Sequence, residues 1–564
     1  MRTSTHSNAT RTLVLAAATA LLAAGCSSAS KSATPAFTSI EGYRSQQAEW
    51  GQCDSDWFVK AERFSSAFNT TVARCTTVKV PAVYDGSAKL ADFSLALMML
   101  PSTGKAPKKG VLFLNPGGPG ESGVDQVQWM EFPQAVRDRY DIIGFDPRGV
   151  KNSQPADGQK ISCDDKLDFA TYWVLTGPVR NAQDEAKMKA ASDEYYADCK
   201  KRNPSWWVLG TKNVVQDLDV MREVLTADEP LNFFGSSYGT TIAAEYIRAY
   251  PQHVGRITLN SPTDTSTDNY DRAIIQAKAR EASIMRFVDG YAKAKGKTRA
   301  QVQALMLEVA DWAAKGQMRG FMGMKPSDDG RSRQSNLYMF THGIMALTYY
   351  DNTEAQSAFN DALDAAYGEK WLGSFEYFGM NLDGYDPKPM YDAFSEGKGY
   401  NLSNLKRDNS YEIMTMVNAM DRDGRDLHTH AEMDAQDKRA RAAAPFGSKL
   451  SMDDGSYVSY PERPGNEWSW FAFEDKTIPD PPATIAARVN TSGKPVLVVG
   501  SRLEATTPYS FAQATARDLK SPLVTYEGSG HAPLLSVKNA CLDAVFINYM
   551  VNDTLPTSAV SCAG

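Results

Sequence analysis

The fold is decided by residues 231–246, LNFFGSSYGTTIAAEY. An apolar run at 231–234 leads into Gly-Ser-Ser-Tyr-Gly at 235–239, and a helix of small residues is predicted to follow. This order of strand, sharp turn and helix is typical of a nucleophile elbow, in which glycines on both sides of a serine allow a tight backbone bend. Ser237 is therefore the candidate nucleophile.

A mostly parallel sheet is predicted around this elbow, because short β-rich runs alternate with helical segments from about residue 75 onward. The strands are expected at residues 90–100, 110–115, 140–146, 231–234, 256–260, 494–500 and 522–526, the last being the final strand. A helix is expected at 214–225. Another is expected at 507–519, with Thr507 as its N-cap and Pro508 at its first position.

The alternation of strands and helices stops after the strand at 256–260 and resumes with the strand at 494–500. Residues 265–479 contain long stretches of helical period and no glycine-rich turns between strands and helices, so they are predicted to form an inserted, mainly helical lid. The core is then discontinuous and consists of residues 40–264 and 480–564.

The N-terminus predicts export. Two arginines precede an apolar run at 12–24, which is too short to span a bilayer but has the length of a signal peptide core. Small residues then lead to Cys26, as in a bacterial lipoprotein processing site; an ordinary cleavage site with an incidental cysteine is the alternative. We expect residues 1–25 to be a signal peptide, residues 26–39 a flexible tether, and the protein to be anchored by lipid outside the cytoplasmic membrane.

Charge and cysteine content narrow the function further. The net charge of -7 provides no basic surface, which disfavours nucleic acid as a partner. Without Cys26, six cysteines remain, an even number that suits disulfides in an exported protein. Because short loops close most readily, the expected pairs are local in sequence: Cys53 with Cys75, Cys163 with Cys199, and Cys541 with Cys562.

A serine nucleophile needs a general base, and the base needs a carboxylate to orient it. Of six histidines, only His531 follows a late strand, in a glycine-rich turn at 527–531. Glu504 is the only acid in the loop after the preceding strand. In hydrolases with this kind of sheet the order along the chain is serine, acid, histidine, which these residues follow. Asp475 and Asp480 are the alternative acids.

Backbone N–H groups are needed to stabilise the oxyanion of the reaction intermediate. Tyr238, directly after the nucleophile, supplies one of them. The glycine-rich loop at 115–123 follows an early strand and is expected to supply the other, from Gly118 or alternatively from Gly117. The loop lacks the Lys-Ser/Thr ending of a nucleotide-binding loop.

Five motifs together resemble the secreted tripeptidyl aminopeptidases of the α/β-hydrolase class, which are relatives of prolyl aminopeptidase. The motifs are NPGGPG at 115–120, GFDPRG at 144–149, GSSYGT at 235–240, LEATTP at 503–508 and GH at 530–531. The resemblance implies an α/β-hydrolase fold and a serine exopeptidase that removes short peptides from free N-termini, with acidic groups holding the substrate ammonium. Asp146 and Arg148 are expected to brace the oxyanion loop.

The chain departs from this family in two places. Glu504 stands where the family usually has Asp, and residues 414–421 lack a cysteine that the family often has in its lid. Activity is still expected, because glutamate serves in related triads. Glu121, beside the oxyanion glycines, is the candidate for binding the substrate ammonium.

Two other functions remain open from the sequence. The same triad would serve an esterase or lipase acting on envelope lipids, and a hydrolase scaffold can also be a non-catalytic binding lipoprotein. No cofactor is expected. A metal site is disfavoured: His428 and His430 are two residues apart in a region predicted as helix or loop, where they would not face the same way.

Overall fold

The computed structural model describes residues 37–163, 190, 197–264, 266–267, 269–320, 331–382, 387–395, 408–421, 430–450, 493–494 and 496–564. The expected signal peptide and Cys26 lie outside the described residues, as do Asp475, Asp480 and His428. Within the described ranges, no helix has both the length and the apolar character needed to cross a membrane.

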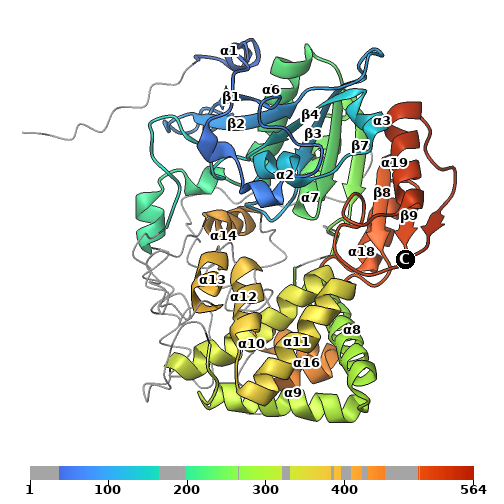
Figure 1. The fold of residues 1–564 in the computed structure, drawn as a ribbon. Helices are drawn as coiled ribbons and strands as arrows, with labels where there is room; N and C mark the ends of the chain where they lie inside the picture. Colours follow the sequence, from blue (N-terminus) through green and yellow to red (C-terminus); the bar gives the residue numbers. More distant parts are fainter. Residues whose placement is uncertain are drawn as a thin grey trace, which may run out of the picture. The chain divides into compact units, whose positions relative to one another are not determined.

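The strands of the described residues form one ten-stranded sheet (Figure 1). The strands follow the order β1-β2-β4-β3-β6-β7-β8-β9-β10, and β5 pairs with β2. From β4 to β10 neighbouring strands are parallel, whereas β2 runs antiparallel to β1, β4 and β5. The strands are β1 Arg74–Val80, β2 Phe93–Leu100, β3 Gly110–Asn115, β4 Tyr140–Phe145, β5 Gln154–Pro155, β6 Leu231–Ser236, β7 Val254–Asn260, β8 Leu497–Ser501, β9 Leu523–Tyr526 and β10 Val560–Cys562.

Helices cover both faces of the sheet, as Figure 1 shows. One core lies between the sheet and α1, α6, α7 and α18; the other lies between the sheet and α2, α3 and α19. Within β3, Phe113 belongs to the first core and Leu112 to the second, so both faces of the strand are buried and its sequence is continuously apolar. These helices are α1 Ile40–Arg44, α2 Gly123–Trp129, α3 Gln134–Arg137, α6 Thr211–Thr226, α7 Tyr238–Ala249, α18 Tyr509–Asp518 and α19 Ala540–Asn552.

Between β7 and β8 the described elements are all helices, and many of them share a third apolar core. The capping box at Thr298 and the side-chain cap at Asn352 set the starts of α9 and α11. The helices are α8 Asn269–Lys295, α9 Arg299–Ala314, α10 Arg331–Tyr350, α11 Thr353–Glu369, α12 Gly373–Leu382, α13 Lys388–Ser395, α14 Ser410–Met420, α15 His430–Ala443 and α16 Pro445–Leu450. Short 3-10 turns occur at η1 Ser55–Trp57, η2 Ala61–Arg63, η3 Trp206–Val208 and η4 Pro251–His253.

Two local predictions are wrong. β9 is not the last strand, since β10 follows and pairs with it in parallel; three residues are too few to show a strand pattern in the sequence. The helix expected from Thr507 begins at Tyr509, with Pro508 at the N-cap position. The hydroxyl and N–H of Thr507 bind Glu504 instead of capping the helix.

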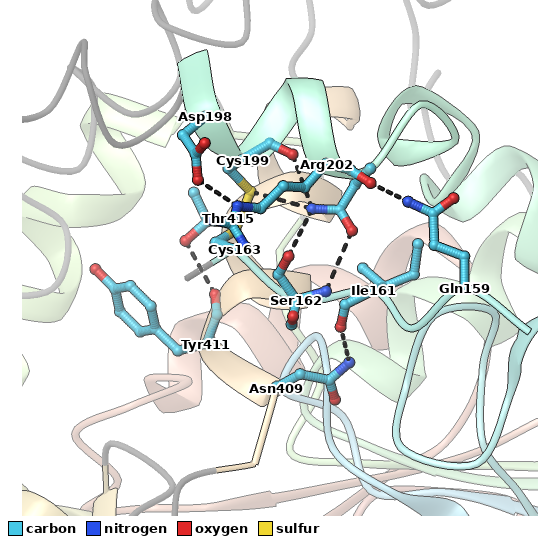
Figure 2. Close-up of a disulfide and its surroundings, with 11 residues drawn as sticks. Gln159, Ile161, Ser162, Cys163, Asp198, Cys199, Arg202, Asn409, Tyr411 and Thr415 are labelled. Atoms are coloured by element: carbon cyan, nitrogen blue, oxygen red, sulfur yellow. Dashed lines mark hydrogen bonds and ion pairs between the residues drawn. A yellow bond between two sulfur atoms is a disulfide. The ribbon is translucent and has the colours of Figure 1, made fainter. Parts of the chain in front are cut away.

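The three expected disulfides are present: Cys53–Cys75, Cys163–Cys199 and Cys541–Cys562. Figure 2 shows the second of them next to α14. The Nδ2 of Asn409, just before α14, donates to the carbonyl of Ile161 at 2.9 Å, two residues from Cys163. The segment next to the Cys163–Cys199 disulfide therefore supports the start of α14, which lies beside the candidate site described below.

Candidate active site

Ser237 occupies a sharp turn between β6, which ends at Ser236, and α7, which begins at Tyr238. Its backbone has φ 52° and ψ -125°, a conformation that serine rarely adopts outside such turns. A Cβ on Gly235 would lie 2.5 Å from the carbonyl oxygen of Gly239, so only glycine fits there. The predicted strand, turn and helix of a nucleophile elbow are confirmed.

The structure brings His531 and Glu504 into direct contact, between Nδ1 of the imidazole and Oε1 of the carboxylate. The two side chains are only 2% and 1% exposed, so their interaction is protected from water. With Nδ1 engaged by the carboxylate, Nε2 is the nitrogen left for proton transfer. Nε2 is buried and has no hydrogen-bond partner in the described part of the chain.

Asn260, at the end of β7, connects the elbow to the histidine loop. Its carbonyl accepts the N–H of Ser237 at 3.1 Å. Its side chain both accepts the N–H of Leu534 at 3.1 Å and donates to the carbonyl of Leu534 at 3.2 Å, three residues beyond His531. No hydrogen bond joins the Ser237 hydroxyl to His531 in this structure; in many hydrolases that bond forms only when substrate binds.

The geometry favours Gly118 over Gly117 as an oxyanion donor. The N–H of Gly117 already donates to Oδ1 of Asn115 at 3.1 Å. The N–H groups of Gly118 and Tyr238 have no acceptor among the residues that the structure describes. A Cβ on Gly117 would lie 3.0 Å from the nitrogen of Tyr238, so the glycine loop and the elbow touch. The amide of Tyr238, next to Ser237 in the chain, and that of Gly118, in the loop that touches the elbow, are therefore the candidate donors for an oxyanion.

Glu121 lies in the same loop and close to the histidine. A Cβ on Gly118 would lie 3.5 Å from Cγ of Glu121. The residue remains exposed to solvent, yet desolvation by the surrounding protein raises the pKa of its carboxyl, while the nearby His531 acts to lower it. The structure therefore places Glu121 beside Gly118, the candidate oxyanion donor.

Asp146 braces the oxyanion loop, whereas Arg148 does not. Asp146 accepts a hydrogen bond from the Ser122 hydroxyl at 2.5 Å and from the N–H of Val124 at 3.2 Å, which fixes the end of the loop. Arg148 instead forms a buried ion pair with Asp217 of α6 and donates to carbonyls outside the loop. The expectation for Arg148 is wrong, because its long side chain reaches past the loop to α6.

Two helices of the region between β7 and β8 lie against the site. The carbonyl of Tyr349, in α10, accepts the N–H of His531 at 3.0 Å, and the Tyr349 ring centroid is 4.6 Å from that of the imidazole. At α14, the carbonyl of Ser410 is so close to Gly120 that a Cβ there would lie 2.2 Å from it. The sequence pattern contained no signal for these contacts.

Within the described ranges, no group of three or more His, Cys, Asp or Glu residues is placed so that it could hold a metal ion. His430 begins α15, and its side chain is not among those described. His253 contacts Asp219 at 2.8 Å, at the start of β7 and hence at the opposite end of the sheet from His531.

Two family models match parts of the chain. Residues 110–300 match a family model described as alpha/beta hydrolase fold, and residues 464–562 match one described as TAP-like protein. The chain has the α/β-hydrolase fold that the first of these models describes. With its elbow, histidine and acid in the order of this family, it is a serine hydrolase related to the tripeptidyl aminopeptidases.

Curated relatives of this α/β-hydrolase match along most of its length. Serine protease Hip1 of Mycobacterium tuberculosis is 26% identical over 506 residues, which cover 87% of each chain. Tripeptidyl aminopeptidase of Streptomyces lividans is 26% identical over 91% of this chain and 86% of its own. Carboxylesterase B of Mycobacterium tuberculosis is 25% identical over 92% of this chain and 90% of its own.

Solved structures resemble this α/β-hydrolase only weakly. Esterase E22 gives a TM-score of 0.34 at 13% identity, covering 85% of this chain and 99% of that one. Proline iminopeptidase of Mycobacterium smegmatis gives 0.30 at 11% identity, covering 84% and 98%.

Proposed function

We propose that this serine hydrolase is an exopeptidase that removes short peptides, most simply tripeptides, from free N-termini. The observation that carries the proposal is the position of Glu121, an accessible carboxylate in the loop of the oxyanion amide of Gly118 and near His531. A substrate ammonium would form an ion pair with this carboxylate, and desolvation of the carboxylate would strengthen the pair. Relatives named tripeptidyl aminopeptidase support the choice of peptide as substrate.

In the proposed mechanism, Ser237 attacks the scissile carbonyl and His531 takes the serine proton through Nε2. The acyl-enzyme forms when His531 returns that proton to the leaving amine, and water then hydrolyses it by the same route. Glu504 stabilises the imidazolium that forms in each step. The amides of Gly118 and Tyr238 would together lower the barrier, with each donor contributing about 2.7 to 4 kcal/mol.

Lipid anchoring and export belong to the same proposal. They are supported by the signal-like run at 12–24 and by Cys26. The substrates would then be peptides or protein N-termini outside the cytoplasmic membrane.

The test compares chromogenic tripeptides with free and acetylated N-termini. Wild type should cleave the free peptide at least tenfold faster, and Glu121→Gln should raise KM for the free peptide while leaving turnover of a simple ester unchanged. Ser237→Ala, the control, should lose all activity and all labelling by a fluorophosphonate. Faster turnover of blocked peptides or esters would favour an esterase, and a folded wild-type protein that is not labelled would favour a binding protein.

A further inference from the structure

Ser261 contacts two parts of the candidate site that are far apart in the sequence. Its Oγ donates a hydrogen bond to Oε2 of Glu504 at 2.6 Å. The same Oγ accepts the N–H of Ala532, the residue after His531, at 3.0 Å. One buried hydroxyl therefore joins the carboxylate to the loop that carries the histidine.

The backbone at Ser261 has a conformation that favours glycine, with φ 55°. The residue follows the last residue of β7, is fully buried, and donates its own N–H to the carbonyl of Val499 at 2.8 Å. That backbone bond would be equally available to glycine. What serine adds at this strained position is its hydroxyl, and strain of this kind persists where the surrounding structure makes use of it.

The two oxygens of Glu504 have different partners. Oε1 contacts His531 and accepts hydrogen bonds from Thr507, whereas Oε2 accepts one from Ser261. These bonds on both sides fix the rotation of the carboxylate plane. An aspartate is one methylene shorter, so from the same backbone position it could not keep contact with both His531 and Ser261.

We propose that Ser261 is a positioning residue that holds the Glu504 carboxylate against His531, and that its hydroxyl adapts the site to glutamate instead of aspartate. The proposal rests on the triad of the proposed function. It applies to any acyl-transfer substrate, since Ser261 acts through the carboxylate.

The main test is Ser261→Gly, which removes the hydroxyl and also relieves the backbone strain. We expect kcat for a p-nitrophenyl ester to fall at least tenfold with KM unchanged, and the rate of fluorophosphonate labelling to fall by a similar factor. Ser261→Ala, which keeps the strain, should lose as much kcat. Lys520→Gly is the matched control: Lys520 also has positive φ, at 51°, but is exposed and has no contact with the triad.

A double-mutant cycle with Glu504→Asp separates positioning from general damage. In wild type, Glu504→Asp should lower kcat strongly; in Ser261→Gly it should lower kcat by a smaller factor, because the contact that aspartate cannot keep is already lost. The positioning role would be overturned if Ser261→Gly kept the kcat of wild type. It would also be overturned if Glu504→Asp lowered kcat by the same factor in wild type and in Ser261→Gly. If the proposed triad itself is wrong, the result is different: fluorophosphonate labelling persists in Ser237→Ala.

Discussion

At the scale of single residues, Asp146 shows how burial and hydrogen bonding act against each other at a carboxyl group. The side chain is fully buried at the end of β4, and burial raises its pKa to about 7. Hydrogen bonds from Ser122 and Val124 favour the ionised form and limit that rise. The residue that braces the oxyanion loop therefore titrates near neutral pH.

The stability of the protein should depend on pH through Asp146. Its pKa is higher in the folded state than the value of about 3.9 in an unfolded chain, so the folded state binds more protons between these values. The stabilisation that Asp146 contributes to the folded state is fully present below about pH 4. It is lost as the pH rises toward 7, and the free energy of unfolding falls by up to about 1.4 kcal/mol per pH unit.

The measurement is urea denaturation of wild type and Asp146→Asn across this range. The free energy of unfolding of wild type should fall relative to the variant as the pH rises, and the difference should level off above the folded pKa. A difference that does not change with pH would contradict the expectation.

At the scale of elements, the oxyanion loop and α14 must approach very closely. The loop has positive φ at Gly117, Gly118 and Gly120, and the carbonyl of Ser410 lies where a side chain on Gly120 would begin. The N-terminal end of α14 therefore limits the position of the loop that carries the candidate amide of Gly118. The absence of a cysteine at 414–421 does not prevent this contact.

We expect Gly120→Ala to displace the loop from α14 and lower kcat at least tenfold, because its Cβ would lie 2.2 Å from the Ser410 carbonyl. Gly158→Ala is the matched control: Gly158 also has positive φ, at 88°, but a Cβ there meets nothing within 4 Å. The control should lose only about 1 to 2 kcal/mol of stability, the cost of a left-handed backbone for alanine, and keep its kcat. Equal kcat in the two variants would show that the approach of α14 does not matter.

At the scale of the whole molecule, three disulfides connect neighbouring segments. They join residues separated by 22, 36 and 21 positions, so each closes a short loop. Cys541–Cys562 fixes β10 to α19, and the carbonyl of Cys562 accepts the N–H of Glu527, at the start of the histidine loop, at 2.9 Å. This disulfide therefore helps to hold the loop that carries His531, the candidate general base.

Replacing Cys541 and Cys562 together by serine should lower the free energy of unfolding by about 2 to 4 kcal/mol, since the unfolded chain then loses a constraint. The urea midpoint measures the change. Adding a reductant to wild type should destabilise it by more, because the other two bridges open as well. An unchanged midpoint in the double variant would contradict the prediction.

Much of the candidate site is predictable because its signals are local. The glycines around Ser237 specify a tight turn, and elimination among six histidines leads to His531. Glu504 follows from its position after a strand. The choice between Gly117 and Gly118, by contrast, required coordinates, since it depends on a hydrogen bond to Asn115.

The sequence by itself indicated the mostly parallel sheet, the elbow, the candidate serine, acid and histidine, and the disulfide pairs, because each of them has a local signal: a strand pattern, a glycine-rich turn, an acid or histidine just after a strand, or two nearby cysteines. Only the tertiary structure decided that Asn260 and Ser261 hold the elbow, acid and histidine together. Ser261 is 243 positions from Glu504 and 271 from Ala532, and a hydrogen bond over such a separation leaves no periodic pattern in the sequence. Parallel strands bring these distant residues to one edge of the sheet, where a single hydroxyl can reach both.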